Sequence, residues 1–300
     1  MADDKYQIVT DRLLEIMAKG TLPWRKEWKP GSRTYRNLTT GTVYQSTNTL
    51  ICMVDSLTFG YESPFFVTFK AAKAKGWSIK KGAKATNLLK FRPKTKEIEK
   101  EDGEKTTVSF PFFDWFQVFN TDSIIDSRAE VKIADLTAKY DLGMPSEKER
   151  YEKAEAIITA QKANVSYGHS KAAYAPSEDI ILMPNLEQFT HVEAYYSTHL
   201  HELIHRTGHP SRLNRKMNTD KNSSEYAFEE LIAELGAAYV CQEVGIKSSL
   251  ENHASYLNHW LGHLKSNEKA IFTASGAATK AANYILENAG IIKEKALAAE

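Results

Sequence analysis

The chain has 300 residues, of which 42% are hydrophobic, so it can form two domains or one large one with a packed core. Its two cysteines, Cys52 and Cys241, lie far apart and define no disulfide framework, which favours a reducing compartment such as the cytoplasm. No apolar signal-peptide region follows the acidic start, and no run approaches the roughly 18 apolar residues of a membrane span. We therefore expect neither a secreted protein nor a membrane protein.

The net charge of +1 hides a division along the chain. The segment from Lys19 to Lys96 has 16 Lys and Arg against three acids, a net charge of +13, and the rest of the chain carries a net charge of −12. All nine histidines lie at or after His169. A basic first half predicts contact with a polyanion, and the histidines confine metal chemistry to the second half.

The first half reads as a compact α+β domain over residues 1–125. Hydrophobic periodicity predicts helices over 4–19, ended by Gly20, and over 48–57. A short strand or the approach to a helix is expected over 63–69, a Lys-rich helix over 70–75, and a strand over 86–92. A charged hairpin loop over 94–105 then leads to a return strand over 108–119. Residues 126–146 lose this periodicity and are expected to form a linker.

Basic residues interleaved with aromatic ones are typical of proteins that bind single-stranded nucleic acid, because cations follow the phosphates and aromatic rings stack on unpaired bases. The candidates for stacking are Trp24, Trp28, Tyr35, Tyr44 and Trp77. The candidates for phosphate contacts are Arg25, Lys26, Arg33, Arg36, Lys73, Lys80, Lys81 and Lys84. Each aromatic side chain has the alternative of packing in the core. Charge alone does not show whether the protein prefers single-stranded or duplex DNA. We expect it to bind duplex DNA more weakly than single-stranded DNA.

The second half, residues 147–300, reads as a mainly helical domain with a small sheet. Helices are expected over 147–163, 197–207, 225–241, 250–264 and 266–288. Residues 180–184 form a strand, expected at the edge of a substrate groove. Residues 211–215 read as an exposed basic loop. The alternatives for His169 and Tyr174 are transition-state stabilisation or packing, and His253, His259 and His263 read as structural.

The motif His201-Glu202-x-x-His205 lies on the helix expected over 197–207. Residues four apart share one face of a helix, so both imidazoles can bind the same metal ion. The carboxylate of Glu202 then stands beside the ion, where it can take a proton from a metal-bound water. Gly208 ends this helix shortly after His205.

A catalytic zinc ion takes three protein ligands, and the third is sought among the acids of the helix over 225–241. Glu230 and Glu234 share a face, so we expect Glu230 to bind the metal and Glu234 to hydrogen-bond a ligand histidine, with the reverse assignment as the alternative. Glu229 is expected to be solvated. An ordinary charged helix face is the competing interpretation.

Two imidazoles and a carboxylate suit Zn²⁺, although other divalent ions such as Mn²⁺ fit the same donors. The motif predicts a zinc peptidase of the gluzincin type, in which Glu202 activates the water that attacks a peptide carbonyl. A second hypothesis is a DNA-binding protein whose metal site is structural or vestigial. A metal nuclease is less favoured, because such enzymes usually need more carboxylates or a second metal ion.

The chain also resembles the ArdC-type antirestriction proteins of plasmids, which are similar to the N-terminal part of TraC-type primases. The resemblance rests on segments 22–24, 44–48, 60–61, 67–69, 76–82, 179–184, 201–215 and 229–236. One departure is Gln45-Ser46-Thr47-Asn48, where the family more often has Arg-Gly-x-Asn. The resemblance implies a single-stranded-DNA-binding domain joined to a zincin-like metallopeptidase domain. It also implies a role in protecting incoming plasmid DNA from host restriction during conjugation, with a component of the restriction system as a candidate protein substrate.

Overall fold

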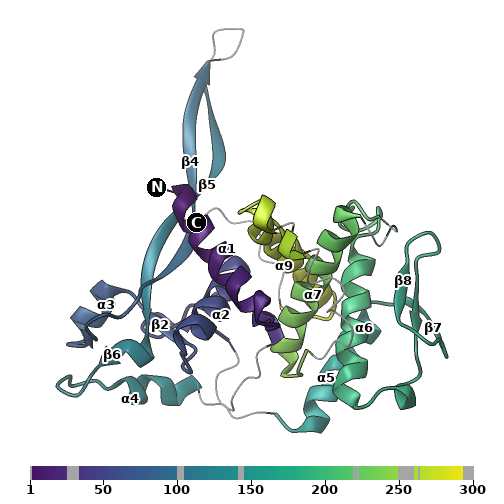
Figure 1. Cartoon of the computed structure of the whole chain (residues 1–300), viewed down its shortest axis with the longest axis horizontal. Helices are drawn as coiled ribbons and strands as arrows, with labels where there is room; N and C mark the ends of the chain where they lie inside the picture. Colours follow the sequence, from purple (N-terminus) through teal and green to yellow (C-terminus); the bar gives the residue numbers. More distant parts are fainter. Residues whose placement is uncertain are drawn as a thin grey trace.

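A computed structural model describes residues 2–25, 34–99, 105–140, 145–218, 220, 223–248, 260–262 and 264–292. It is a mixed helix and sheet protein, with an N-terminal α+β half followed by a mainly helical half (Figure 1). The expected fold class is therefore confirmed.

The N-terminal half contains helices α1 to α4 and strands β1 to β6. Its helices are α1 (Ala2–Ala18), η1 (Pro23–Arg25), α2 (Thr47–Phe59), α3 (Phe69–Ala74), η2 (Thr121–Ser123), α4 (Ile133–Thr137) and η3 (Ala138–Tyr140). Its strands are β1 (Arg36–Asn37), β2 (Phe65–Val67), β3 (Ser78–Ile79), β4 (Thr86–Glu99), β5 (Lys105–Asn120) and β6 (Ile124–Ile125). The helices expected over 4–19, 48–57 and 70–75 are present with small changes in their bounds.

Four strands form one sheet in the order β1-β2-β5-β4, and β3 pairs with β6 in a second. The ladder between β4 and β5 runs from Thr86 opposite Val118 to Glu99 opposite Lys105, so the two strands form a long arm that projects from the body (Figure 1). The prediction of a loop over 94–105 was therefore wrong at both ends. Charged side chains can line a solvated ribbon as readily as a loop, so charge alone does not locate the turn.

The second half contains helices α5 to α9 and strands β7 to β9. Its helices are α5 (Glu147–Ala160), η4 (Leu186–Gln188), α6 (Val192–Thr207), α7 (Ser224–Val244) and α9 (Ala270–Asn288). Its strands are β7 (Asn164–Tyr167), β8 (Ala173–Ala175) and β9 (Ile180–Met183), in the sheet order β7-β9-β8. The predicted edge strand is β9, which instead lies in the middle of this sheet. Most of the helix expected over 250–264, including His253, His259 and His263, lies outside the described residues.

One hydrophobic core joins the two halves. It runs from α1 and α2 through α6 and α7 to α9. The Thr10 hydroxyl donates to the Glu268 carbonyl at 2.8 Å, and the rings of Trp24 and Trp260 meet edge to face at 6.3 Å. A smaller core holds part of the predicted linker, because Ile133, Leu136 and Tyr140 pack against it.

Among the described residues, no helix has both the length and the apolar character required to span a bilayer.

Candidate metal centre

Helices α6 and α7 cross in the core and bring the predicted ligands together. His201 and His205 lie one turn apart on α6, and Glu230 projects from α7. Gly236 sets how closely the helices approach, because a Cβ atom there would meet Ile204 Cδ1 and Cγ2 at 2.9 Å each. Close packing through a glycine thus holds the two ligand-bearing helices at a fixed separation.

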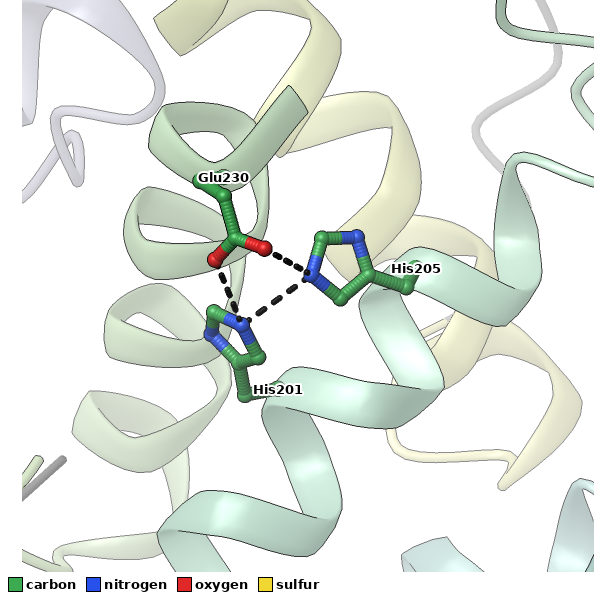
Figure 2. A group of neighbouring side chains, drawn as sticks. All are labelled: His201, His205 and Glu230. Carbon is green, nitrogen blue, oxygen red and sulfur yellow. Dashed lines mark hydrogen bonds and ion pairs between the residues drawn. The ribbon is translucent and has the colours of Figure 1, made fainter. Parts of the chain in front are cut away.

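The three side chains converge on one point, as Figure 2 shows. His201 Nε2 lies 3.1 Å from His205 Nε2, and the Glu230 carboxylate oxygens lie 3.4 Å from His201 Nε2 and 3.6 Å from His205 Nε2. A tetrahedral ion with bonds of about 2.0–2.1 Å separates its ligand atoms by about 3.3 Å. This triangle of two nitrogens and one oxygen therefore fits a divalent ion.

The site is buried and its carboxylates favour positive charge. His201, His205 and Glu230 are each less than 9% exposed. Burial alone would lower the pKa of His205, but the charge of Glu230 and the hydrogen bonds that the imidazole donates to Glu229 and Glu230 raise it well above its ordinary value. Burial would likewise raise the pKa of Glu230, but the neighbouring histidines lower it. A buried divalent cation would supply the positive charge that these groups favour.

Glu229 contacts the ring nitrogen of His205 that faces away from the metal point. Its Oε1 lies 3.2 Å from His205 Nδ1, which fixes the tautomer that points the Nε2 lone pair toward the metal point. Glu229 is 5% exposed, so the prediction that it is solvated was wrong. Burial would raise its pKa, but hydrogen bonds from Arg215 and His205 lower it. The carboxylate is therefore charged when it holds the imidazole.

Arg215 comes from the loop after α6 and completes this arrangement. Its Nε and Nη2 donate to the two Glu229 oxygens at 2.9 and 2.6 Å, and Nη2 also donates to the Ile204 carbonyl at 2.8 Å. Gly208 makes room for it, because a Cβ atom there would lie 3.0 Å from Arg215 Nη2. Gly208 has a right-handed helical conformation, so space rather than a positive φ favours glycine here. Sequence reasoning missed Arg215, since residues 211–215 read as an exposed basic loop.

Glu234 lies one turn beyond Glu230 and is fully buried. It accepts a hydrogen bond from Trp24 Nε1 at 3.3 Å, so it connects α7 to the N-terminal half. Glu229, rather than Glu234, is the carboxylate bonded to the ligand His205. Helix phase groups Glu230 with Glu234, but the crossing of α6 over α7 brings Glu229 to His205.

Glu202 follows His201 on α6 and is 7% exposed. Its charge is one of the smaller contributions that raise the pKa of His205. Glu202 is thus a buried carboxylate next to a predicted ligand in the sequence of α6, and its role as the base that activates water stays a prediction.

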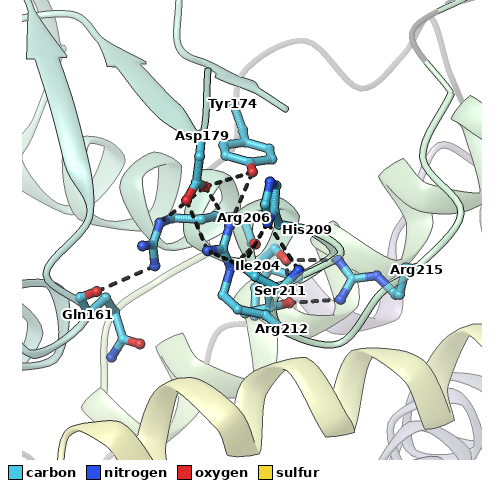
Figure 3. A network of polar contacts seen from close by, with 10 residues as sticks. Gln161, Tyr174, Asp179, Ile204, Arg206, His209, Ser211, Arg212 and Arg215 are labelled. Carbon is cyan, nitrogen blue, oxygen red and sulfur yellow. Dashed lines mark hydrogen bonds and ion pairs between the residues drawn. The ribbon is translucent and has the colours of Figure 1, made fainter. Parts of the chain in front are cut away.

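A second polar network surrounds the end of α6 (Figure 3). Arg212 Nη1 donates to Asp179 Oδ2 at 3.0 Å, and Tyr174 donates its hydroxyl to Asp179 Oδ1 at 2.8 Å. The Arg212 hydrogen bonds hold the pKa of Asp179 at about 2. His169 bonds Ser166 Oγ at 2.9 Å. Tyr174 and His169 thus have local hydrogen-bond partners, as the packing alternative requires.

The aromatic residues proposed to stack on bases lie in the core. Trp24, Tyr35, Tyr44 and Trp77 are 4%, 1%, 7% and 4% exposed. Trp77 donates to the Val131 carbonyl at 2.8 Å, and the rings of Tyr35 and Tyr44 pack against Phe66. None of these four rings exposes a face to solvent on which a base could stack, so the stacking prediction was wrong for them. Composition does not distinguish an aromatic residue of the core from one of a binding surface.

The proposed phosphate contacts divide into three groups. The exposed ones are Lys73, Lys80, Lys81 and Lys84. Arg36 is half-buried, with its guanidinium 4.3 Å from the centre of the Tyr140 ring. The proposed phosphate contacts that lie outside the described residues and side chains are Arg25, Lys26 and Arg33, and the stacking candidate Trp28 lies there too.

Comparison with known families matches both halves separately. Residues 3–119 match the family described as the N-terminal domain of anti-restriction factor ArdC, and residues 152–277 match the zincin-like metallopeptidase family. The boundary between the two matches falls within residues 120–151.

Comparison with individual proteins extends over almost the whole chain. The crystal structure of the metal-free antirestriction ArdC protein from plasmid R388 superposes with a TM-score of 0.73 at 33% identity, covering 96% of this chain and 99% of that one. Its Mn(II)-bound structure superposes with a TM-score of 0.72 at 31% identity. The DNA primase TraC of Escherichia coli is 33% identical over 94% of this chain, which spans only 27% of that protein. These matches show that the chain belongs to the ArdC family of antirestriction proteins.

Proposed function

We propose that this chain protects incoming plasmid DNA from restriction by binding single-stranded DNA and by acting as a metal-dependent peptidase. The observation that supports the peptidase most strongly is the convergence of His201, His205 and Glu230, whose ligand atoms lie within 4.8 Å of one another. Zn²⁺ is the favoured ion for these donors, and the Mn(II)-bound relative supports a divalent metal in general.

In this proposal His201, His205 and Glu230 hold the ion. A bound divalent ion polarises a carbonyl group and makes water more acidic. Glu202 accepts the proton of the attacking water and can return it to the leaving amine. Glu229 and Arg215 keep the imidazole of His205 oriented toward the ion. The substrate would be a protein, such as a component of the restriction system.

The DNA-binding part of the proposal rests on charge. Residues 19–96 carry a net charge of +13, and the lysines of α3 and of the segment that follows β3 are exposed. A basic surface of this kind binds the phosphates of a single strand without regard to sequence. We expect single-stranded DNA to be preferred over duplex DNA, and the protein to act in the cytoplasm without a membrane partner.

A second candidate function is a DNA-binding protector whose metal ion is structural. The burial of the ligands favours it, because His201 and His205 on α6 and Glu230 on α7 would let an ion crosslink two core helices. In that case DNA occupancy alone would provide protection, and Glu202 would be dispensable.

Transfer of unmodified plasmid DNA into a restricting host, with wild type or Glu202→Ala, separates these candidates. A matched control is Glu243→Ala, which removes a carboxylate from the far end of α7. The peptidase proposal predicts that Glu202→Ala binds metal and oligo-dT normally but fails to protect. Normal protection by this variant would favour the structural role of the metal.

A further inference from the structure

A continuous acid-free segment lies within the basic half. Residues 63–96 contain no Asp or Glu and ten Lys or Arg. This segment forms β2, α3, β3 and β4. In Figure 1, α3 and the β3–β6 pair lie at the opposite end of the molecule from α6, so this region is remote from the metal centre.

Phe69, the first residue of α3, is 60% exposed and is the most exposed large hydrophobic side chain in the described part of the chain. Ala72 packs inward on the small core that contains Trp77, while Phe69 and Lys73 share the outer face of the helix, four residues apart. A single exposed aromatic residue is ordinary by itself, so its significance depends on what surrounds it.

Exposed lysines follow Phe69 on α3 and also lie just after β3, the strand that contacts α3. The α3–β3 surface consists of Phe69, Lys70, Lys73, Lys80, Lys81 and Lys84. Trp77 fixes the two elements to one another, because its backbone N–H donates to the backbone carbonyl of Ala72 at 2.9 Å and its ring lies in the small core. The lysines of this surface are therefore held on one rigid part of the domain.

The lysine charges of this surface are not neutralised by any carboxylate in the part of the chain that the structure describes. Within the described residues, none of its five lysines forms an ion pair with a carboxylate. Lys80 Nζ donates to the carbonyl of Asp122 at 2.7 Å, while the Asp122 carboxylate accepts from the backbone N–H groups of Glu62 and Ser63. The surface thus offers positive charge to an external anion.

We propose that the α3–β3 surface binds single-stranded DNA, with Phe69 stacking on one unpaired base and the lysines contacting the phosphates on either side. Charge complementarity selects a nucleic acid, and an exposed ring with free faces selects a strand whose bases are unpaired. This inference rests on the proposed DNA-binding function. The stacking role that the buried aromatic residues cannot fill is assigned to Phe69, the aromatic side chain of this surface that solvent reaches.

The test is fluorescence anisotropy of a labelled 20-nucleotide oligo-dT with the full chain. Phe69→Ala should weaken binding by about 5- to 150-fold, which corresponds to the roughly 1–3 kcal/mol of one stacked base. Phe69→Trp should retain affinity because it keeps an aromatic face. The matched control is Leu186→Ala, which removes a 43% exposed apolar side chain from the other half of the protein and should leave affinity unchanged.

The phosphate contacts are tested through the salt dependence of the same binding. Each lost contact to a single strand makes the negative slope of log K against log salt shallower by about 0.7, so Lys80→Gln with Lys81→Gln should reduce its magnitude by about 1.4. Lys148→Gln on α5, whose side chain is 83% exposed, is the control and should not change the slope.

The outcomes separate this inference from the function on which it rests. If wild type does not bind oligo-dT, the DNA-binding proposal fails as a whole. If wild type binds and Phe69→Ala behaves like Leu186→Ala, the α3–β3 surface is not the binding site and the inference is overturned. Equal affinity for duplex DNA, with no effect of Phe69→Ala, would also overturn it.

Discussion

Replacement of Arg215 by alanine tests the support behind His205. The variant removes the guanidinium that contacts both Glu229 oxygens, and it also removes the donors to the Ile204 carbonyl and to Thr207 Oγ1. Glu229 would then keep its buried negative charge with His205 as its remaining partner among these contacts.

The expected cost follows from burial. The side chains of Arg215 and Glu229 are 11% and 6% exposed, so Arg215→Ala leaves a largely buried carboxylate without its guanidinium partner. Removal of one member of a buried pair typically costs about 3–5 kcal/mol in the free energy of unfolding. Because Glu229 orients a ligand histidine, we also expect metal affinity to fall by about 10- to 100-fold.

Urea denaturation of the metal-free protein measures the first effect, and calorimetric titration with Zn²⁺ measures the second. Lys153→Ala is a matched control, because it breaks an exposed pair with Glu243 and should cost less than about 1 kcal/mol. The double variant Arg215→Ala with Glu229→Ala also removes the unpaired buried carboxylate. Its loss in the free energy of unfolding should therefore be smaller than the sum of the two single losses by about 2 kcal/mol or more. Additive losses, or unchanged Zn²⁺ affinity in Arg215→Ala, would refute this reasoning.

Three further predictions concern packing, pH and backbone strain. Gly236→Ala should destabilise the protein by about 1–2 kcal/mol in urea denaturation, because the clash with Ile204 outweighs the gain in helix propensity. The same substitution should cost less stability in an Ile204→Ala background. Equal losses of stability in the two backgrounds would contradict the contact. The pKa of Asp179 lies at about 2, below its usual 3.8, chiefly because Arg212 hydrogen-bonds the carboxylate. The carboxylate therefore contributes stability above about pH 4 that is lost as the pH falls through 2. Asp179 is 31% exposed, so we expect about 1–2 kcal/mol, and the difference from Asp179→Asn should be mostly lost at about pH 2 and absent below about pH 1. Ser46 has φ 59° and ψ −136°, so Ser46→Gly should be more stable than Ser46→Ala by about 1 kcal/mol in thermal unfolding, whereas the reverse order would exclude strain at this residue.

Local periodicity was sufficient to select the three residues that converge in the candidate site. The spacing of His201 and His205 requires only a helix, and the phase of the next acidic helix identified Glu230. These are properties of single helices, which a sequence pattern encodes directly. The convergence of the three side chains depends also on the crossing of α6 and α7, which Gly236 permits.

The support around the ligands depends on tertiary contacts that no local pattern encodes. Arg215 reaches Glu229 from a loop, and its basic neighbourhood is equally typical of an exposed segment. Trp24 reads as a stacking residue because it lies among cations, yet it is buried and donates to Glu234 from the other half of the protein. Phe69 was missed for the opposite reason, since an apolar residue before a lysine-rich helix is usually part of the core.

The most direct test of the metal centre is anomalous diffraction from crystals of the protein grown with Zn²⁺. We predict one peak, about 2.0–2.2 Å from His201 Nε2, His205 Nε2 and a carboxylate oxygen of Glu230, with Glu229 outside bonding distance of the ion. A peak ligated by Glu229 or Glu234 in place of Glu230, or no peak between α6 and α7, would contradict it.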